Sequence, residues 1–173
     1  MTDETLLESQ VTYLYHASAK ELYNLALYSI GGQPLAEQLS IDAFVSVFYH
    51  LKDKSDATQF RIKSARHLYL TSKKTLISHS WHSAPESDRL ERLESANDIE
   101  KSRIQQLLIG LNYDERFLLL LVLQQKFSQK QIAGILCIPK FIVKKRIYRM
   151  LKKAINLWAT LTEYEHIGKL SER

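Results

Sequence analysis

The most distinctive chemistry in this sequence is a long run of cations without acids. From Arg116 to Thr162 the chain has ten Lys and Arg residues and no Asp or Glu, and eight of the ten lie between Ser128 and Lys153. Like charges at helical spacing repel one another unless a partner neutralises them. Lys and Arg gathered along one segment are the residues that bind the phosphates of nucleic acids, so this run indicates a surface for a polyanion.

The net charge is divided unequally along the chain. Residues 1–70 carry a net charge of −2, residues 71–110 carry 0 and residues 111–173 carry +7, which gives the overall +5. A uniformly basic protein would indicate general adhesion to polyanions. The division instead predicts a polyanion-binding C-terminal part joined to an N-terminal part with another partner.

The periodicity of apolar residues predicts helices throughout and no strands. In residues 35–51, seven apolar residues recur at steps of three and four and predict one buried stripe: Ala36, Leu39, Ala43, Phe44, Val47, Phe48 and Leu51. The joint before this helix is marked by Gly31, Gly32 and Pro34. The predicted helices are 4–30, 35–51, 58–77, 99–111, 114–126, a short helix from an N-cap at Ser128 to Leu136, and a last helix that has Pro139 in its first turn and runs through Trp158.

A change of composition divides these helices into two groups. In residues 78–97 the helical periodicity of apolar residues is lost. This stretch is rich in Ser, His, Glu and Asp and includes Pro85, a composition typical of a linker. We therefore predict an all-α protein with two small helical domains joined by a flexible linker: residues 1–77, the linker 78–97, and residues 98–173.

The basic segment has the spacing of a helix-turn-helix, in which a second helix enters the major groove. Its second helix has a predicted inward stripe of Val143, Ile147, Met150, Leu151 and Ala154. Phe141 and Ile142 cannot both face inward beside Val143, so one of them is expected to meet a thymine methyl group or a protein surface. The predicted DNA contacts are Lys130, Lys140, Phe141, Lys144, Lys145, Tyr148 and Arg149.

Together with the segment just upstream, this region resembles region 4 of bacterial sigma factors. The residues that match the family pattern are Leu111, Glu115, Arg116, Ile132, Ala133, Ile138, Pro139, Val143, Lys144 and Arg146. The resemblance implies that the basic helix binds the promoter −35 element.

The N-terminal half is similar to region 2 of the same family. Residues 36–44 resemble the helix that docks on the polymerase clamp, and residues 64–67 resemble the start of the promoter-melting segment. This resemblance implies polymerase-binding residues Glu37, Gln38, Ile41, Asp42 and Val45, and −10 DNA-binding, strand-opening residues Phe60, Lys63, Arg66, His67 and Tyr69. Two short modules and a linker are the layout of the extracytoplasmic-function (ECF) group, whose partners are core RNA polymerase and promoter DNA.

Other classes of function lack a signature in the sequence. We find no catalytic or phosphate-cradling motif and expect neither an enzyme nor a cofactor. His79 and His82 lack further ligands nearby, so no metal site is expected. The one cysteine, Cys137, excludes an internal disulfide and is expected to be a small buried residue. With no apolar run of about 18 residues and an acidic, polar start, the sequence predicts a cytoplasmic protein with no membrane span.

Two alternatives remain open. Departures from the family pattern at Gln38, Ile41, Phe60 and His67 support a sigma-like adaptor that binds an anti-sigma factor or another regulatory protein. The second alternative is a stand-alone helix-turn-helix transcription regulator that binds duplex DNA as a dimer.

Overall fold

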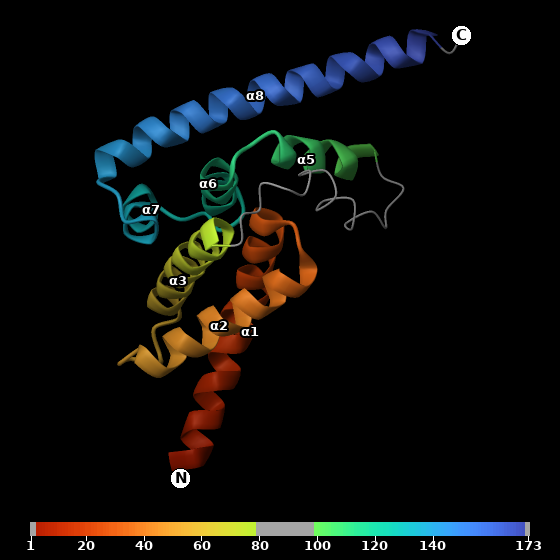
Figure 1. Cartoon of the computed structure of the whole chain (residues 1–173). Helices are drawn as coiled ribbons and strands as arrows, with labels where there is room; N and C mark the ends of the chain where they lie inside the picture. Colours follow the sequence, from red (N-terminus) through yellow and green to blue (C-terminus); the bar gives the residue numbers. More distant parts are fainter. Residues whose placement is uncertain (1–2, 79–98, 172–173) are drawn as a thin grey trace.

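The described secondary structure is entirely helical. The computed structural model of the chain describes the backbone of residues 3–78 and 99–171 and the side chains of residues 5–76 and 103–162. Its helices are α1 (Asp3–Ile30), α2 (Gln33–His50), α3 (Ala57–Ser78), α5 (Ile99–Ile109), α6 (Tyr113–Leu123), α7 (Gln129–Leu136) and α8 (Lys140–Ser171), as Figure 1 shows. The predicted all-α class is therefore confirmed for these residues. None of the helices described has an apolar stretch that would cross a membrane.

The joint between α1 and α2 follows from its glycine and proline residues. Gly31 has a φ of 85°, a conformation that costs glycine little because it has no Cβ. Its amide donates to the carbonyl of Leu27 at 2.8 Å and so closes the end of α1. Pro34 lies in the first turn of α2, where a helix does not need its N–H group.

The predicted apolar stripe of α2 is confirmed. Ala36, Leu39, Ala43, Val47, Phe48 and Leu51 are buried, and Phe44 is partly buried. The stripe packs on α1 and α3, which both contact α2 (Figure 1). Phe60 of α3 packs against this stripe, and its ring meets that of Phe44 edge to face with the ring centroids 4.9 Å apart.

One hydrophobic core joins the N-terminal and C-terminal helices. α1 packs against α6, and α3 packs against α7 (Figure 1). The buried residues of this core come from each of the helices named above and include Leu25, Ala36, Leu68, Leu108, Phe117, Ile135 and Met150. The helices of the two predicted domains therefore share this core, beside a second cluster formed by residues of the N-terminal helices alone. The predicted linker, beyond Ser78, lies outside the described residues, so the domain boundaries stay a prediction.

Two of the C-terminal helices begin with matching capping boxes. The Asn112 side chain accepts from the Glu115 amide at 2.9 Å, and the Glu115 carboxylate accepts from the Asn112 amide at 3.1 Å. Ser128 and Gln131 make the same reciprocal pair at the start of α7. Each box satisfies backbone donors that a helix start leaves free. The predicted N-cap at Ser128 is confirmed, and α6 begins one residue before the predicted start because Asn112 is its cap.

The last helix is longer than predicted. α8 continues past Trp158 to Ser171, a stretch in which no proline interrupts the helix. Its N-terminal half is held by Val143, Met150 and Ala154, which are buried. Further along, α8 packs on α5, and a Cβ added to Gly110 would lie only 2.9 Å from Cδ1 of Leu157. The absence of a side chain at Gly110 thus permits this close approach.

Candidate nucleic-acid interface

The geometry of the candidate interface is set by the turn between α7 and α8. α7 ends at Leu136, and three residues separate it from the start of α8 at Lys140. The Ile138 amide donates to the carbonyl of Ala133 at 3.1 Å, which ties the turn to α7. Ile132 and Ile135 of α7 are buried in the same core as Val143 of α8. The two helices are therefore fixed relative to each other by packing as well as by the short turn.

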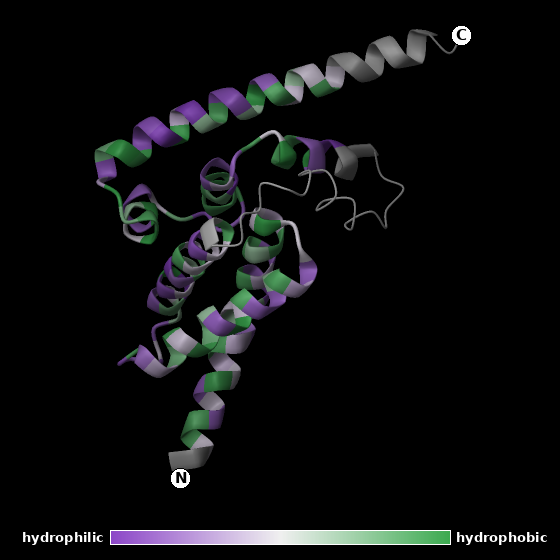
Figure 2. Ribbon diagram, viewed as in Figure 1, coloured by the Kyte–Doolittle hydropathy of each residue, from purple (hydrophilic) through white to green (hydrophobic). Residues whose placement is uncertain are grey.

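The predicted DNA-contact residues all lie on the exposed side of these two helices. Phe141 is 76% exposed and Tyr148 is 69% exposed, while Ile142 is partly buried, so Phe141 is the outward residue of that pair. The exposed cations are Lys130, Lys140, Lys144, Lys145, Arg146, Arg149 and Lys152. Hydrophilic and apolar residues alternate along the first half of α8 in Figure 2, as a helix with one buried face requires. The exposure of the predicted contacts is confirmed, whereas their role in DNA binding stays a prediction.

The expectation that Cys137 is buried is wrong. Cys137 is exposed and has a left-handed backbone conformation, with φ 55° and ψ 41°. This conformation ends α7 and is one that non-glycine residues adopt at a cost. Among the described residues, no three His, Cys, Asp or Glu side chains gather where they would hold a metal ion. His79 and His82 lie outside the described residues.

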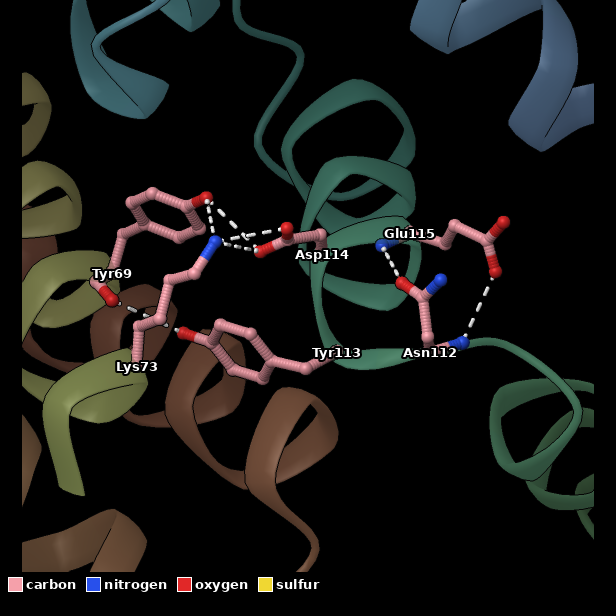
Figure 3. Close-up of polar contacts among 6 residues, drawn as sticks. All are labelled: Tyr69, Lys73, Asn112, Tyr113, Asp114 and Glu115. Carbon is pink, nitrogen blue, oxygen red and sulfur yellow. Dashed lines mark hydrogen bonds and ion pairs between the residues drawn. The ribbon is translucent and has the colours of Figure 1, made fainter. Parts of the chain in front are cut away.

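The two acids at the start of α6 are held by cations from other helices. Lys73 Nζ of α3 lies 2.9 Å from Asp114 Oδ2, and the Tyr69 hydroxyl donates to Asp114 Oδ1 at 3.0 Å (Figure 3). On the other side, Lys153 Nζ of α8 lies 2.6 Å from Glu115 Oε2. The sequence predicts a helix that starts at Asp114, but it does not indicate these partners, which lie about forty positions away in the chain.

The pKa shifts in this cluster follow from burial and hydrogen bonding. Burial raises the pKa of the Tyr69 hydroxyl, and the hydrogen bond from Lys73 acts in the opposite direction. Burial lowers the pKa of Lys73, but its hydrogen bonds to Asp114 and Tyr69 outweigh this and leave that pKa raised. Burial also raises the pKa of Tyr113, whose ring stacks on that of Tyr69 with centroids 6.1 Å apart (Figure 3). At neutral pH the cluster therefore has a cationic lysine and two neutral tyrosines.

The prediction for the −10 site on α3 needs a correction. Phe60 is 0% exposed and Tyr69 is 4% exposed, so neither ring offers a face on which an unpaired base can stack. Lys63 and Arg66 are exposed and His67 is partly buried. The aromatic members of the predicted site are core residues, and only its polar members remain accessible.

A second polar contact ties α1, α3 and the end of α6 together. Arg61 of α3 forms an ion pair with Glu21 of α1 at 2.6 Å and donates to Gln125 Oε1 at 3.3 Å. The Gln125 amide nitrogen in turn donates to the backbone carbonyl of Glu21 at 3.0 Å. Arg61 is thus occupied by contacts within the protein. No local pattern in the sequence points to this arrangement.

The predicted protein-binding residues form an exposed face of α2. Ile41 is 54% exposed and Val45 is 44% exposed, and Tyr49 extends the apolar part of the face with 75% exposure. Glu37, Gln38 and Asp42 are exposed beside them. Ile41 and Val45 also line a groove of about 780 Å³ between α2 and α1. This face is distinct from the core stripe, and its partner stays a prediction.

Comparison with known proteins assigns no family to this chain. No protein-family model matches it, and no curated protein matches it significantly.

Proposed function

We propose that this protein is a sigma factor of the ECF type, which binds core RNA polymerase and directs it to specific promoters. The observation that carries the proposal is the exposed face of α7 and the first half of α8, on which every charged side chain is a cation. An exposed apolar and acidic face on α2 provides a second, different surface. A protein with one surface for a polyanion and one for a protein suits the recruitment of an enzyme to DNA.

In this proposal α7 and α8 act as a helix-turn-helix on the −35 element. Lys140, Lys144 and Lys145 lie in the first two turns of α8, the part of a recognition helix that reaches base edges. Lys and Arg there bind phosphates or guanine O6 and N7, and the exposed Phe141 offers an apolar contact to a thymine methyl group.

In the same proposal, α2 docks on core polymerase. Ile41 and Val45 expose apolar area that no other described helix covers, and Glu37 and Asp42 give the same face a negative charge. Such a face suits a partner with apolar pockets and basic surroundings. On α3, Lys63 and Arg66 are available to the backbone of the −10 region, with the partly buried His67 beside them.

The test of the proposal is to purify the protein with core RNA polymerase and to assay promoter-specific transcription in vitro. Lys144→Glu with Lys145→Glu should abolish binding of the upstream element and retain binding to core polymerase. Ile41→Asp with Val45→Asp should do the reverse. The control is Ile104→Asp with Leu123→Asp, which changes two exposed apolar residues elsewhere, on α5 and α6. Absence of core polymerase from the purified complex would refute the proposal.

One observation favours a second candidate, a stand-alone helix-turn-helix regulator. Phe60 and Tyr69 are buried, so neither supplies α3 with a ring for holding an opened strand. A regulator that binds closed duplex DNA does not need one. This candidate predicts binding to a palindromic site as a dimer and no association with core polymerase.

A further inference from the structure

The exposed acids of this protein are confined to one part of the described chain. Among the described side chains, the exposed acids are Glu8, Glu37, Asp42 and Asp53, all on α1, on α2 or in the loop after α2. In α3, α7 and α8, as far as Thr162, every exposed charged residue is a cation. The basic character of α8 thus extends to α3, which comes from the other half of the chain.

The packing places α3, with its exposed cations, beside α7. α3 contacts α7, and α7 contacts α8 (Figure 1). On α3, Ile62, Arg66, Tyr69 and Lys73 lie on one side of the helix at steps of three and four. Tyr69 and Lys73 bind Asp114 of α6, so this side faces the C-terminal helices. Arg66 therefore lies at the border between α3 and those helices.

Farther from this border, the exposed side of α3 carries further cations. Gln59, Lys63, Leu70 and Lys74 are exposed and contain two more cations and no acid. Lys63, Arg66 and Lys74 form no ion pair within the described part of the chain.

The two acids at the start of α6 are neutralised by cations of α3 and α8. Asp114 lies against Lys73, and Glu115 lies against Lys153. Both are only partly accessible to solvent. They therefore tie α6 to α3 and α8, and their charges are offset by Lys73 and Lys153.

We infer that Lys63, Arg66 and Lys74 of α3 and the cations of α7 and α8 form one continuous surface that binds a single DNA duplex when the helices are packed as they are here. This inference rests on the proposed DNA-binding role of α8 and adds α3 to the same footprint. A duplex fits better than a single strand because the exposed stripe of α3 contains no aromatic residue on which bases stack. Its cations can neutralise phosphates of the duplex backbone.

The experiment measures binding of the full chain to a duplex about three helical turns long. Fluorescence anisotropy is recorded between about 50 and 200 mM salt, where phosphate contacts determine the slope of log affinity against log salt. The α3 variant is Lys63→Gln with Arg66→Gln. The matched control is Lys20→Gln with Lys52→Gln, which removes the same charge from α1 and from the loop after α2.

The α3 variant should weaken binding on the order of tenfold or more at about 0.1 M salt. It should also reduce the steepness of the slope by about 1.8, or about 0.9 for each phosphate that the protein no longer neutralises. The control should leave the slope unchanged. Equal behaviour of the α3 variant and the control would overturn the inference. Stronger binding of a single strand of DNA or RNA of equal length would overturn the choice of duplex.

A third variant separates this inference from the proposed function. Lys144→Gln with Lys145→Gln removes two cations from α8 and should also reduce the slope. If this variant weakens binding and the α3 variant does not, the inference fails and the role of α8 stands. If neither has an effect, both fail. All substituted residues are exposed, so circular dichroism and thermal unfolding should match the unsubstituted protein.

Discussion

Replacement of Asp114 by Ala should destabilise the whole protein, because this residue joins α6 to α3. The side chains of Asp114 and Lys73 are 38% and 43% exposed, so solvent limits their ion pair to at most about 1 kcal/mol. The Tyr69 hydroxyl, in a residue that is 4% exposed, loses an acceptor at a cost of about 1 kcal/mol. Loss of a negative charge at the start of α6 adds about 0.3–1 kcal/mol.

The expected total is about 2 kcal/mol in the free energy of unfolding, or a fall of about 4–8 °C in Tm for a chain of this length. Asp114→Asn retains an oxygen that accepts from Tyr69 and should cost only about half as much. Urea denaturation followed by circular dichroism and by tyrosine fluorescence measures both variants.

Two results would refute this reasoning. Equal effects of the Ala and Asn variants would show that the hydrogen bond from Tyr69 contributes nothing. Two separate transitions, of which Asp114→Ala shifts only one, would show that the helices on either side of residues 79–98 unfold independently. A shared core requires instead that both probes report one transition.

Three further predictions concern alkaline pH and the ends of α7. Folding raises the pKa of Tyr69, Tyr113 and Lys73. The stabilisation that these shifts contribute is complete below the pKa values of the unfolded chain, near 10 for tyrosine and 10.5 for lysine, and it is lost as pH rises through the pKa values of the folded protein. Urea midpoints should therefore fall above about pH 10, and less steeply in Tyr69→Phe; a midpoint independent of pH there would contradict the shifts. Ser128→Ala should lower the free energy of unfolding by about 1 kcal/mol, measured against Gln129→Ala as control. Cys137→Gly should raise it by about 0.5–1 kcal/mol, since glycine tolerates a φ of 55°; a decrease would argue against strain at this turn.

The features that the sequence predicts well are local ones. The buried stripe of α2 follows from apolar residues at helical spacing, and the cap at Ser128 follows from the residue type at the start of a helix. The exposed face of α8 follows from the same periodicity, with charge on one side and apolar residues on the other. In each case the information lies within a few turns of the residue concerned.

The orientation of α3 is less evident because serines lie in its buried face. Ser64 and Ser72 are buried, and Ser72 donates its hydroxyl to the carbonyl of Leu68 at 2.6 Å within the same helix. A serine satisfied in this way is as compatible with a core as an apolar residue, but it weakens the apolar pattern. The expected role of Phe60 and Tyr69 depends on their order in a family-like layout, and their burial shows that order alone does not determine the direction of a side chain.

Contacts between distant segments cannot be predicted from local patterns. Nothing near Lys73 in the sequence indicates Asp114 as its partner, and nothing near Gln125 indicates Glu21. The length of α8 exceeds the prediction for another reason: the stretch after Trp158 contains no residue that ends a helix before Gly168.

The contact between Gln125 and Glu21, which are 104 positions apart, has a consequence for biosynthesis. A ribosome adds roughly 5–20 residues each second, so α6 is synthesised on the order of 5–20 seconds after α1. Leu22, Leu25 and Ala26 are all buried in the finished protein. During this interval they are not yet fully shielded from solvent. A nascent chain of this kind is a natural client for chaperones that hold apolar helices at the ribosomal exit.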